Sequence, residues 1–240
     1  MILAVDAGNT RIKWGLHDGK SWLDRGWVAT GDAHLLGDSW GNIAQPDRIV
    51  ASNVAGQDVA NQINEACRRW PIEIHWVTAM QDQCGVHNSY ENPAQLGGDR
   101  WAALIAARQL APKGSVVVNV GTAMTVDALS AEGVFLGGLI VPGLATMQRA
   151  LAEAAAGVET AAGSLRVFPG NTADAVYSGS LAALAGAVDH MVAALAKAQS
   201  EAPVCLLSGG DAIFLLPLLS GKVTMVDNLV LDGLIRIAMA

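Results

Sequence analysis

The first fifteen residues constrain the fold more than any other stretch, because two apolar runs meet there at a short polar turn. Residues 2–5 (ILAV) have the composition of a buried strand, and residues 12–16 form a second strand-like run. The turn Gly8-Asn9-Thr10 separates them, so the stretch is predicted to form a β-hairpin. Gly8 lets the backbone approach a ligand closely, and the Asn9 and Thr10 amides can point at phosphate oxygens. Such residues are also common in ordinary hairpin turns, so the stretch alone supports either interpretation.

Two charged side chains of this hairpin fit a phosphate ligand. Asp6 directly follows the first apolar run, where its carboxylate can hold a magnesium ion against the phosphates. Lys13 alternates with Ile12 and Trp14, and its ammonium group can reach the same place. In the phosphate interpretation Asp6 is a metal ligand, directly or through water; the rest of the chain decides between that interpretation and an ordinary turn.

Composition excludes several classes of partner. The 240 residues carry a net charge of −7, which argues against nucleic-acid binding through bulk electrostatics. No run of about 18 apolar residues is free of charges or breakers, so we expect no membrane span. Met1 leads directly into a strand, so we expect no signal peptide.

Cys67, Cys84 and Cys205 have neither disulfide nor zinc spacing, which predicts a cytoplasmic protein. Hydrophobic residues make up 52% of the chain and charged residues only 15%, which predicts a subunit interface.

The predicted elements repeat one order in the two halves of the chain. In the first half, strand-like runs lie at 2–5, 12–16, 21–30, 47–53 and 72–77. Helices are expected at 58–70 and 96–110, and a loop at 80–93. Pro112-Lys113-Gly114 then breaks the chain, and we expect a boundary there between domains 1–112 and 113–240. In the second half, strands are expected at 116–120, 124–129, 134–141, 204–207 and 223–226. Helices are expected at 144–155, at 172–199 and at the C-terminus.

The hairpin itself also repeats. Residues 5–16 (VDAGNTRIKWGL) and 118–129 (VNVGTAMTVDAL) each contain a strand, a polar residue, a glycine turn with threonine, and a return strand. Two such hairpins, each opening a βββαβ order, predict a duplicated α/β fold that holds one phosphate chain between two domains. This arrangement resembles the actin, sugar kinase and Hsp70 superfamily. The resemblance implies two similar RNase H-like (actin-like ATPase) domains with a nucleotide cleft between them.

Four motifs in order along the chain narrow the resemblance. They are DxGNT, GxDR, GTAxTxD and GGxIxPG, at residues 6–10, 97–100, 121–127 and 137–143. Tyr90 and Asn92-Pro93 precede the second motif, and Asn171-Thr172 and the run 208–211 (SGGD) also fit. Together they resemble type III pantothenate kinase over residues 2 to about 211. The resemblance implies ATP-dependent phosphorylation of pantothenate to 4'-phosphopantothenate, the first step of coenzyme A biosynthesis.

The resemblance also implies a role for each motif residue. ATP would be bound, with Mg²⁺ as its counter-ion, by Asp6, Ala7, Gly8, Asn9, Thr10, Arg11, Ile12, Lys13, Gly121 and Thr122. Asp99 would be the general base that takes the proton from the primary hydroxyl of pantothenate. Pantothenate would contact Tyr90, Gly97, Gly98, Asp99, Arg100 and Thr172. Thr172 would reach the pantothenate bound to the neighbouring subunit, which implies a homodimer with a shared site.

These motifs also have ordinary structural interpretations. Residues 97–100 are typical of a helix N-terminus, in which Asp99 complements the helix dipole and Arg100 is solvated. Tyr90 fits a half-buried loop aromatic, and Thr172 fits a helix N-cap next to Asn171. The ordered set of motifs favours the catalytic interpretation.

One residue departs from the family pattern. Many members carry aspartate at the position of Asn119, where it helps to coordinate a monovalent cation, K⁺ or NH₄⁺. Asparagine keeps a carbonyl ligand but loses the charge, so we expect this cation to bind weakly or not at all.

Two other functions remain open from the sequence. Some relatives are described as accessory factors, so the chain is alternatively a nucleotide-binding regulator with little turnover. It is also alternatively a kinase of another small hydroxy substrate. Asp99 and Arg100 favour an enzyme, because a protein that only binds nucleotide needs no base. The short chain, with Tyr90 and the 97–100 motif, favours pantothenate over a sugar.

Overall fold

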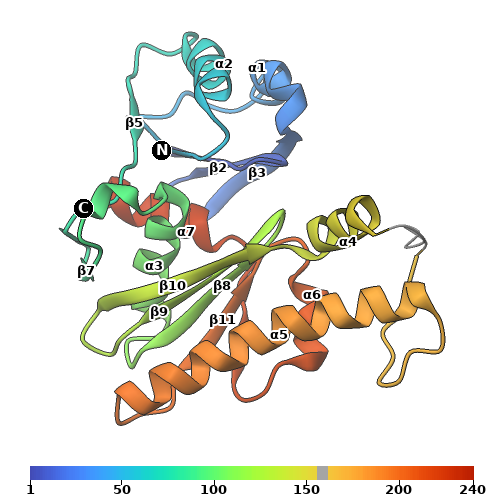
Figure 1. The fold of residues 1–240 in the computed structure, drawn as a ribbon. Coiled ribbons are helices and arrows are strands. Elements are labelled where there is room, and N and C mark those ends of the chain that lie inside the picture. Colours follow the sequence, from blue (N-terminus) through green and yellow to red (C-terminus); the bar gives the residue numbers. More distant parts are fainter. Residues whose placement is uncertain (156–161) are drawn as a thin grey trace. The chain divides into compact units, whose positions relative to one another are not determined.

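The chain folds into two compact α/β units, drawn as ribbons in Figure 1. The computed structural model describes residues 1–155 and 162–240. The first unit comprises Met1–Leu110 and Asn228–Ala240, and the second comprises Ala111–Asp227.

The sheet of the first unit has five strands in the order β3-β2-β1-β4-β5. β1 (Ile2–Ala7), β2 (Arg11–His17) and β3 (Trp22–Ala29) form an antiparallel meander, because short turns join them. β4 (Arg48–Asn53) and β5 (Ile74–Trp76) extend the sheet as parallel strands, which require longer crossover connections.

Helices cover this sheet, and they determine which face each side chain of β1 meets. α1 (Leu36–Ser39) and α2 (Gln57–Cys67) share a hydrophobic core with Leu3, Val5 and Ala7 of β1. α3 (Gly98–Leu110) and α7 (Leu229–Met239) pack against each other, and both contact the sheet. Successive side chains of a strand point to opposite faces, so the remaining β1 residues, Ile2, Ala4 and Asp6, lie on the face that α3 and α7 cover.

α7 belongs to the first unit although it ends the chain. Its Leu231 and Leu234 are buried, and a Cβ added to Gly233 would overlap the carbonyl oxygen of Ala102 on α3. The two helices therefore approach backbone to backbone, which a glycine allows. The expected domain 113–240 differs from the compact units at residues 228–240, because sequence order does not reveal which sheet a terminal helix covers.

The second unit repeats the topology of the first. Its strands lie in the order β12-β11-β8-β9-β10, with bounds Val223–Met225, Val204–Ser208, Ser115–Val120, Ala123–Leu129 and Val134–Pro142. β8, β9 and β10 form an antiparallel meander, and β11 and β12 extend it as parallel strands. This is the first sheet's pattern of a meander followed by two parallel strands, so the predicted duplicated α/β fold is confirmed.

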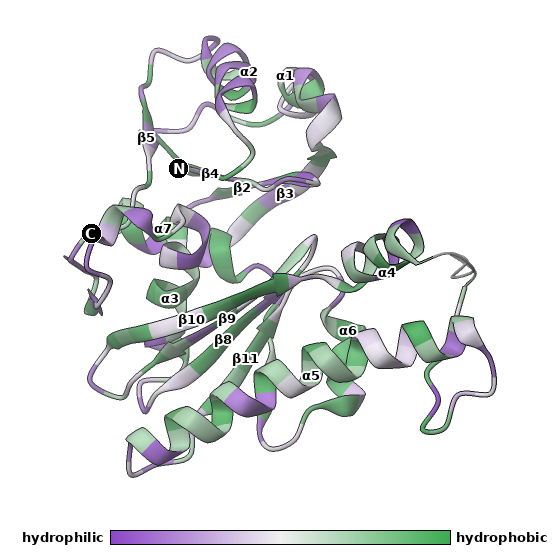
Figure 2. Cartoon of the chain, in the orientation of Figure 1, coloured by the Kyte–Doolittle hydropathy of each residue, from purple (hydrophilic) through white to green (hydrophobic). Residues whose placement is uncertain are grey.

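The helices of the second unit are α4 (Leu144–Ala154), α5 (Thr172–Ala198) and the short α6 (Ala212–Leu215). α5 buries Leu181 and Leu184 against the sheet, and Figure 2 shows hydrophobic residues along much of its length. Among the described residues, α5 is the one helix long and apolar enough to cross a membrane, and 33% of that stretch is buried. A core helix of a soluble protein meets the same criterion, so this is weak evidence for a membrane span.

Two segments contain structure that the sequence does not predict. The expected loop at 80–93 holds a small hairpin, β6 (Asp82–Gln83) and β7 (Val86–Asn88). Its turn places Cys84 at φ 50° and Gly85 at φ 78°, the left-handed conformation of tight hairpin turns. Residues Thr30–Leu35 form a 3₁₀ turn that leads into α1.

Candidate active site

The tip of the β1–β2 hairpin is a tight turn held by its own backbone and by Thr30. The Gly8 N–H donates a hydrogen bond to the Arg11 carbonyl (3.1 Å). Thr30 donates from Oγ1 to the Gly8 carbonyl (2.7 Å) and from its N–H to the Thr10 carbonyl (3.0 Å). Asn9 and Thr10 are exposed, so the turn presents these two residues to a ligand.

The other hairpin residues expected to bind ATP differ in burial. Ala7 and Ile12 are fully buried in the core of the first unit, so only their backbone groups can contact a ligand. Arg11 is exposed, and its guanidinium carbon lies 4.4 Å from the centre of the Trp27 ring, a cation–π contact. This contact anchors a positive charge next to the turn.

Asp6, Lys13 and Ser52 form a row across three neighbouring strands. Asp6 on β1 is paired with Lys13 on β2 and with Ser52 on β4. Paired residues of adjacent strands point to the same face of a sheet, which here is the face covered by α3 and α7. Three polar side chains therefore meet near the carboxyl ends of β1 and β4.

The N-terminus of α3 lies against this row. A Cβ added to Gly98 would lie 2.6 Å from the Val77 carbonyl oxygen and 3.5 Å from Ser52 Oγ. A Cβ added to Gly97 would lie 2.5 Å from Asp99 Oδ1. Asp99, in the first turn of α3, accepts a hydrogen bond at Oδ1 from the N–H of Arg100 (2.8 Å). The two glycines thus let α3 begin close to the sheet, with the Asp99 carboxylate at its start.

Asp6 and Asp99 are close enough for their charges to interact. The pKa of Asp6 is raised from 3.8 to about 7, first by burial and then by the charge of Asp99, while Lys13 acts in the opposite direction. A divalent cation at these carboxylates would favour their ionised forms, so the pair suits a metal ion. Among the described residues, no group of three His, Cys, Asp or Glu could hold a metal ion. A magnesium ion at Asp6 would therefore need further ligands from phosphate or water.

Tyr90 and Arg100 also meet in the first unit. Arg100 Nη1 donates to the Tyr90 hydroxyl (3.4 Å), and the guanidinium carbon lies 6.0 Å from the centre of the tyrosine ring. The loop that carries Tyr90 is organised by Asn88, whose Oδ1 accepts from the Tyr90 N–H (3.1 Å) and whose Nδ2 donates to the Pro93 carbonyl (3.2 Å). Arg100 is only 7% exposed, so the expectation of a solvated arginine at this helix start is wrong.

In the second unit, the turn at Gly121 and Thr122 is held by the start of α4. The Thr122 carbonyl accepts from the Gly143 N–H (2.9 Å) and from Thr146 Oγ1 (2.8 Å). A Cβ added to Gly143 would overlap the Gly121 carbonyl oxygen. The GGxIxPG segment therefore fixes the turn of the GTAxTxD segment, and the Thr122 side chain is exposed above it.

Asn119 takes the position in the second sheet that Asp6 takes in the first. It lies near the end of β8, paired with Thr125 on β9 and with Ser208 on β11. The backbone after Ser208 turns at Gly209, at φ 108°, where an added Cβ would overlap the Val120 carbonyl oxygen. The SGGD segment thus packs directly on the end of β8.

Thr172 lies on the first turn of α5 and is exposed. Asn171 caps the helix, because its side chain accepts a hydrogen bond from the Asp174 N–H (2.8 Å). The structural interpretation of Thr172 as the N-cap is therefore wrong by one residue, since Asn171 is the cap and Thr172 is the first residue of the helix. The described residues leave its role in substrate binding as a prediction.

Two residues belong to this site although the sequence does not single them out. Thr30 holds the hairpin turn, and Ser52 lies beside Asp6. A polar residue at the carboxyl end of a strand was the one signal for Ser52, since ligands of α/β sheets bind at those ends. Thr30 follows the third strand of the meander, and no sequence pattern marks its contact with Gly8.

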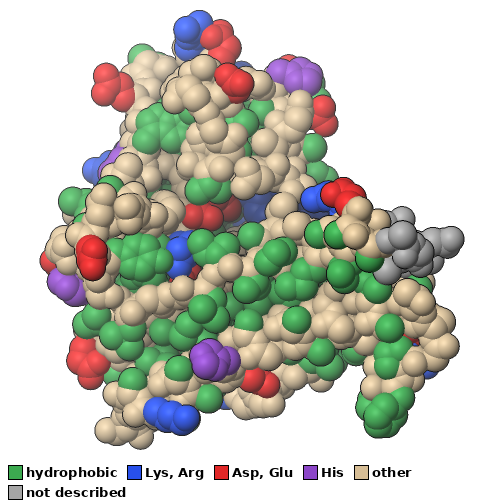
Figure 3. Space-filling view, in the orientation of Figure 1, with side chains coloured by type: hydrophobic (Ala, Val, Ile, Leu, Met, Phe, Trp, Pro, Cys, Tyr) green, Lys and Arg blue, Asp and Glu red, His purple; other side chains and the backbone are tan. Residues whose placement is uncertain are grey.

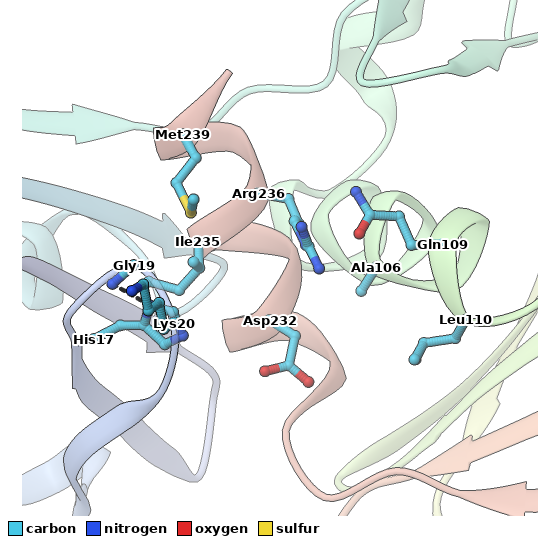
Figure 4. A pocket seen from close by; sticks show the side chains of 10 residues that line it. All are labelled: His17, Gly19, Lys20, Ala106, Gln109, Leu110, Asp232, Ile235, Arg236 and Met239. Carbon is cyan, nitrogen blue, oxygen red and sulfur yellow. Dashed lines mark hydrogen bonds between the residues drawn. The ribbon is translucent and has the colours of Figure 1, made fainter.

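A separate pocket of about 170 Å³ in the first unit contains none of the predicted site residues (Figure 4). Asp232 and Arg236 of α7 line it together with His17 of β2. Trp22 Nε1 donates to Asp232 Oδ1 (3.1 Å), and the Gly19 N–H donates to His17 Nδ1 (2.9 Å). Burial raises the pKa of Asp232 and lowers the pKa of His17. These contacts join the β2–β3 hairpin to α7, and we assign them to the packing of the unit.

Comparisons with known proteins agree over nearly the whole chain. A family model for type III pantothenate kinase matches residues 2–194. The chain is 52% identical over 238 residues to a type III pantothenate kinase of Nitrosospira multiformis, covering 99% of this chain and 91% of that protein. It is 47% identical over 238 residues to the protein of the same name from Aromatoleum aromaticum, covering 99% and 98% of the two chains.

Solved structures support the fold at lower identity. A Campylobacter jejuni protein described as a Baf family transcriptional activator has a TM-score of 0.64 at 21% identity, covering 99% of this chain and 97% of that one. The activator of a 2-hydroxyisocaproyl-CoA dehydratase from Clostridium difficile, with bound ADPNP, has a TM-score of 0.52 at 14% identity, covering 99% and 92%. From the match to the family model and the identity to full-length relatives, this chain belongs to the type III pantothenate kinase family.

Proposed function

We propose that this chain transfers the γ-phosphoryl group of ATP to the primary hydroxyl of pantothenate, the first step of coenzyme A biosynthesis. The observation that carries the proposal is its membership of a kinase family whose members are named for this reaction. The first unit supports the proposal locally. It brings Asp6, Lys13 and Asp99 near one another at one end of its sheet. Tyr90 contacts Arg100, the residue that follows Asp99 on α3.

Asp99 is the proposed general base. In phosphoryl transfer the protein contributes mainly positioning and charge neutralisation, and a well-placed carboxylate accepts the proton of the attacking hydroxyl. The Arg100 N–H holds one carboxylate oxygen, Oδ1, at 2.8 Å. This leaves Oδ2 to accept the proton, with the carboxylate orientation fixed by α3.

Tyr90, Gly97, Gly98 and Arg100 are the proposed pantothenate contacts beside Asp99. A guanidinium group presents paired donors that match the substrate carboxylate, and burial strengthens such a pair. The Tyr90 hydroxyl, 3.4 Å from Arg100 Nη1, would hold the guanidinium group in position for this contact. Gly97 and Gly98 would contribute backbone groups, because they carry no side chain.

The hairpin turn and its second-unit counterpart are the proposed phosphate contacts. Asn9, Thr10 and Thr122 are exposed at the tips of these turns, and Lys13 lies in register with Asp6. Magnesium, when bound at Asp6, would neutralise phosphate charge, and the raised pKa of Asp6 supports a cation there. At Asn119 we propose at most weak binding of K⁺ or NH₄⁺, because an amide oxygen replaces a carboxylate.

We also propose a homodimer in which Thr172 contacts the pantothenate of the neighbouring subunit. Val167 and Phe168, just before α5, are 88% and 92% exposed. The segment that carries them is folded back on α5, since the Arg166 N–H donates to Ser178 Oγ (2.9 Å). Hydrophobic side chains also lie along the part of the surface that α5 forms (Figure 3). Apolar side chains that an ordered segment exposes to solvent indicate a protein–protein interface.

The family consists of soluble metabolic kinases, and we propose a cytoplasmic location for this chain. The three cysteines are free thiols, and burial raises the pKa of Cys67 and Cys205 to about 12. Unpaired, unreactive thiols are typical of a reducing compartment.

The test is ATP-dependent phosphorylation of pantothenate by the purified chain in magnesium buffer, with and without K⁺. Asp99→Asn is expected to lower kcat by about 10²- to 10⁴-fold, the usual contribution of a general base, while ATP binding is retained. Asp58→Asn is a matched control, because Asp58 is also acidic, lies in the first turn of α2 and is exposed. Equal rates for the two variants would remove Asp99 from its role.

The same assay separates the other two functions. ATP binding without turnover of any acceptor would indicate a nucleotide-binding regulator. Turnover of another small hydroxy compound, with pantothenate inert, would indicate a different kinase of the same fold.

A further inference from the structure

Ser52 carries a fully buried hydroxyl group. Its side chain has no exposed surface, and Oγ has no hydrogen-bond partner among the described residues. Buried polar groups in folded proteins are nearly always paired, so an exception calls for a missing partner or a second conformation of a neighbour.

The surroundings of Ser52 contain one strong acceptor in register with it. Asp6 is its pairing partner on β1 and lies on the same sheet face. Lys13 flanks Asp6 on the opposite side, from β2. Asp6 is thus bordered by an ammonium donor on one strand and a hydroxyl donor on the other. Ser52 also lies beside the start of α3, where Gly98 is close to Ser52 Oγ and Asp99 follows Gly98.

The duplicated topology repeats this arrangement. In the second sheet Asn119 has the position of Asp6, and Ser208 on β11 has the position of Ser52. Ser115 is also fully buried, and its Oγ has no hydrogen-bond partner in the described part of the chain, but it lies at the other end of β8, paired with Leu129 and Val204. A serine next to the polar residue at the end of the first strand is therefore common to both sheets.

We propose that Ser52 is a positioning residue, whose hydroxyl donates a hydrogen bond to the Asp6 carboxylate when the nucleotide is bound. This hydrogen bond fixes the orientation of the Asp6 carboxylate relative to Asp99. No covalent bond forms or breaks. Ser52 is too deeply buried to touch substrate, so it acts through Asp6. This inference rests on the proposed function, in which Asp6 takes part in binding nucleotide phosphates.

The experiment is a double-mutant cycle on the binding of MgATP to the full chain, measured by titration calorimetry. Ser52→Ala is expected to weaken binding about tenfold, the size expected for one hydrogen bond to a charged acceptor. In the Asp6→Asn background the same substitution is expected to change binding by less than about twofold, because the carboxylate that it serves is gone. The steady-state rates give a second readout, since KM for ATP is expected to rise while KM for pantothenate stays constant.

Ser115→Ala is the matched control, since it removes an equally buried, unpaired hydroxyl far along the strand from the predicted phosphate turn. It is expected to leave MgATP binding unchanged. Ser52→Thr restores the donor and is expected to restore binding, with its thermal stability measured because its added methyl group lies near Gly98.

Equal losses in the two Asp6 backgrounds, or no loss in either, would overturn the proposal and leave Ser52 a packing residue. Failure of Ser52→Thr to restore binding while it remains folded would do the same. A chain that binds MgATP but does not phosphorylate pantothenate refutes the proposed function and leaves this cycle interpretable. A chain that binds no MgATP refutes both.

Discussion

Replacing Asp6 by asparagine is expected to stabilise the ligand-free protein at neutral and alkaline pH. Asparagine has nearly the same shape as aspartate but cannot ionise, so it removes the effects that burial and Asp99 have on the Asp6 charge. The folded-state pKa of Asp6, about 7, is above the ordinary value of 3.8. The folded protein therefore binds a proton more tightly than the unfolded chain does. As a result, stability falls as the pH rises from about 4 to about 7, and the loss is complete above pH 7.

The size of the effect follows from the pKa difference. One pH unit of tighter proton binding corresponds to about 1.4 kcal/mol, so the full change is about 4 kcal/mol. This is an upper bound, because the Asp6 side chain keeps some contact with solvent, which lessens the effect of burial. For a chain of this size, 1 kcal/mol shifts the melting temperature by about 2–4 °C. We therefore expect Asp6→Asn to melt above the unsubstituted protein at pH 8, by at most about 8–16 °C, and at nearly the same temperature at pH 4.

The assay is thermal unfolding from pH 4 to pH 8 in chelator, without nucleotide, for the unsubstituted protein, Asp6→Asn and Asp24→Asn. Asp24 is exposed on β3 of the same sheet, so its replacement controls for the loss of one negative charge. The difference in melting temperature between the unsubstituted protein and Asp6→Asn, followed against pH, reports the titration of the Asp6 carboxyl group alone, because all other titrating groups are common to both proteins. Parallel stability curves for the two proteins, or a less stable Asp6→Asn at pH 8, would refute the reasoning.

Three further substitutions test the site. Gly98→Ala is expected to destabilise the protein by about 1–3 kcal/mol, because the new methyl group would lie 2.6 Å from the Val77 carbonyl oxygen. Gly37→Ala, whose added methyl group meets nothing within 4 Å, is its control in thermal denaturation, and equal melting temperatures would contradict the close approach of α3. Asn119→Asp is expected to increase the activation of turnover by K⁺, since it restores a charged ligand, and an unchanged K⁺ response would place the cation site elsewhere. Thr172→Ala is expected to raise KM for pantothenate while light scattering still reports a dimer; a higher KM found only together with loss of the dimer would contradict a direct contact.

The elements that local patterns specify were predictable from the sequence. The β1–β2 hairpin has two apolar runs around a glycine turn, and its repeat at residues 118–129 predicted the duplicated sheets. The β6–β7 hairpin was not predicted, because its strands are only two and three residues long and lack an alternating pattern. The place of α7 was not predicted either. Its Leu231 and Leu234 show that one face is buried, but not which sheet buries it.

The candidate site divides in the same way. Asp6, Asp99 and Arg100 stand in motifs, so the sequence alone singles them out. Ser52 stands in no motif, and its significance depends on the register between β1 and β4, which places it opposite Asp6 and not one residue away. A shift of one residue would turn its side chain to the other face of the sheet. Register depends on long-range packing, which local sequence patterns do not specify.

The expected behaviour of Asp6 connects stability and function through one side chain. A residue whose only role is packing gains nothing from a charge that burial and a neighbouring carboxylate both oppose, and an amide or apolar group would fit the same position better. The charge becomes favourable only when a cation or donors face it. Lys13 on β2 supplies a positive charge nearby, Ser52 on β4 can supply a donor, and a metal ion with the nucleotide would supply the rest. Asp6→Asn, which should stabilise the ligand-free first unit, should therefore also weaken nucleotide binding. Asp6→Asn tests both halves of that relation in a single variant.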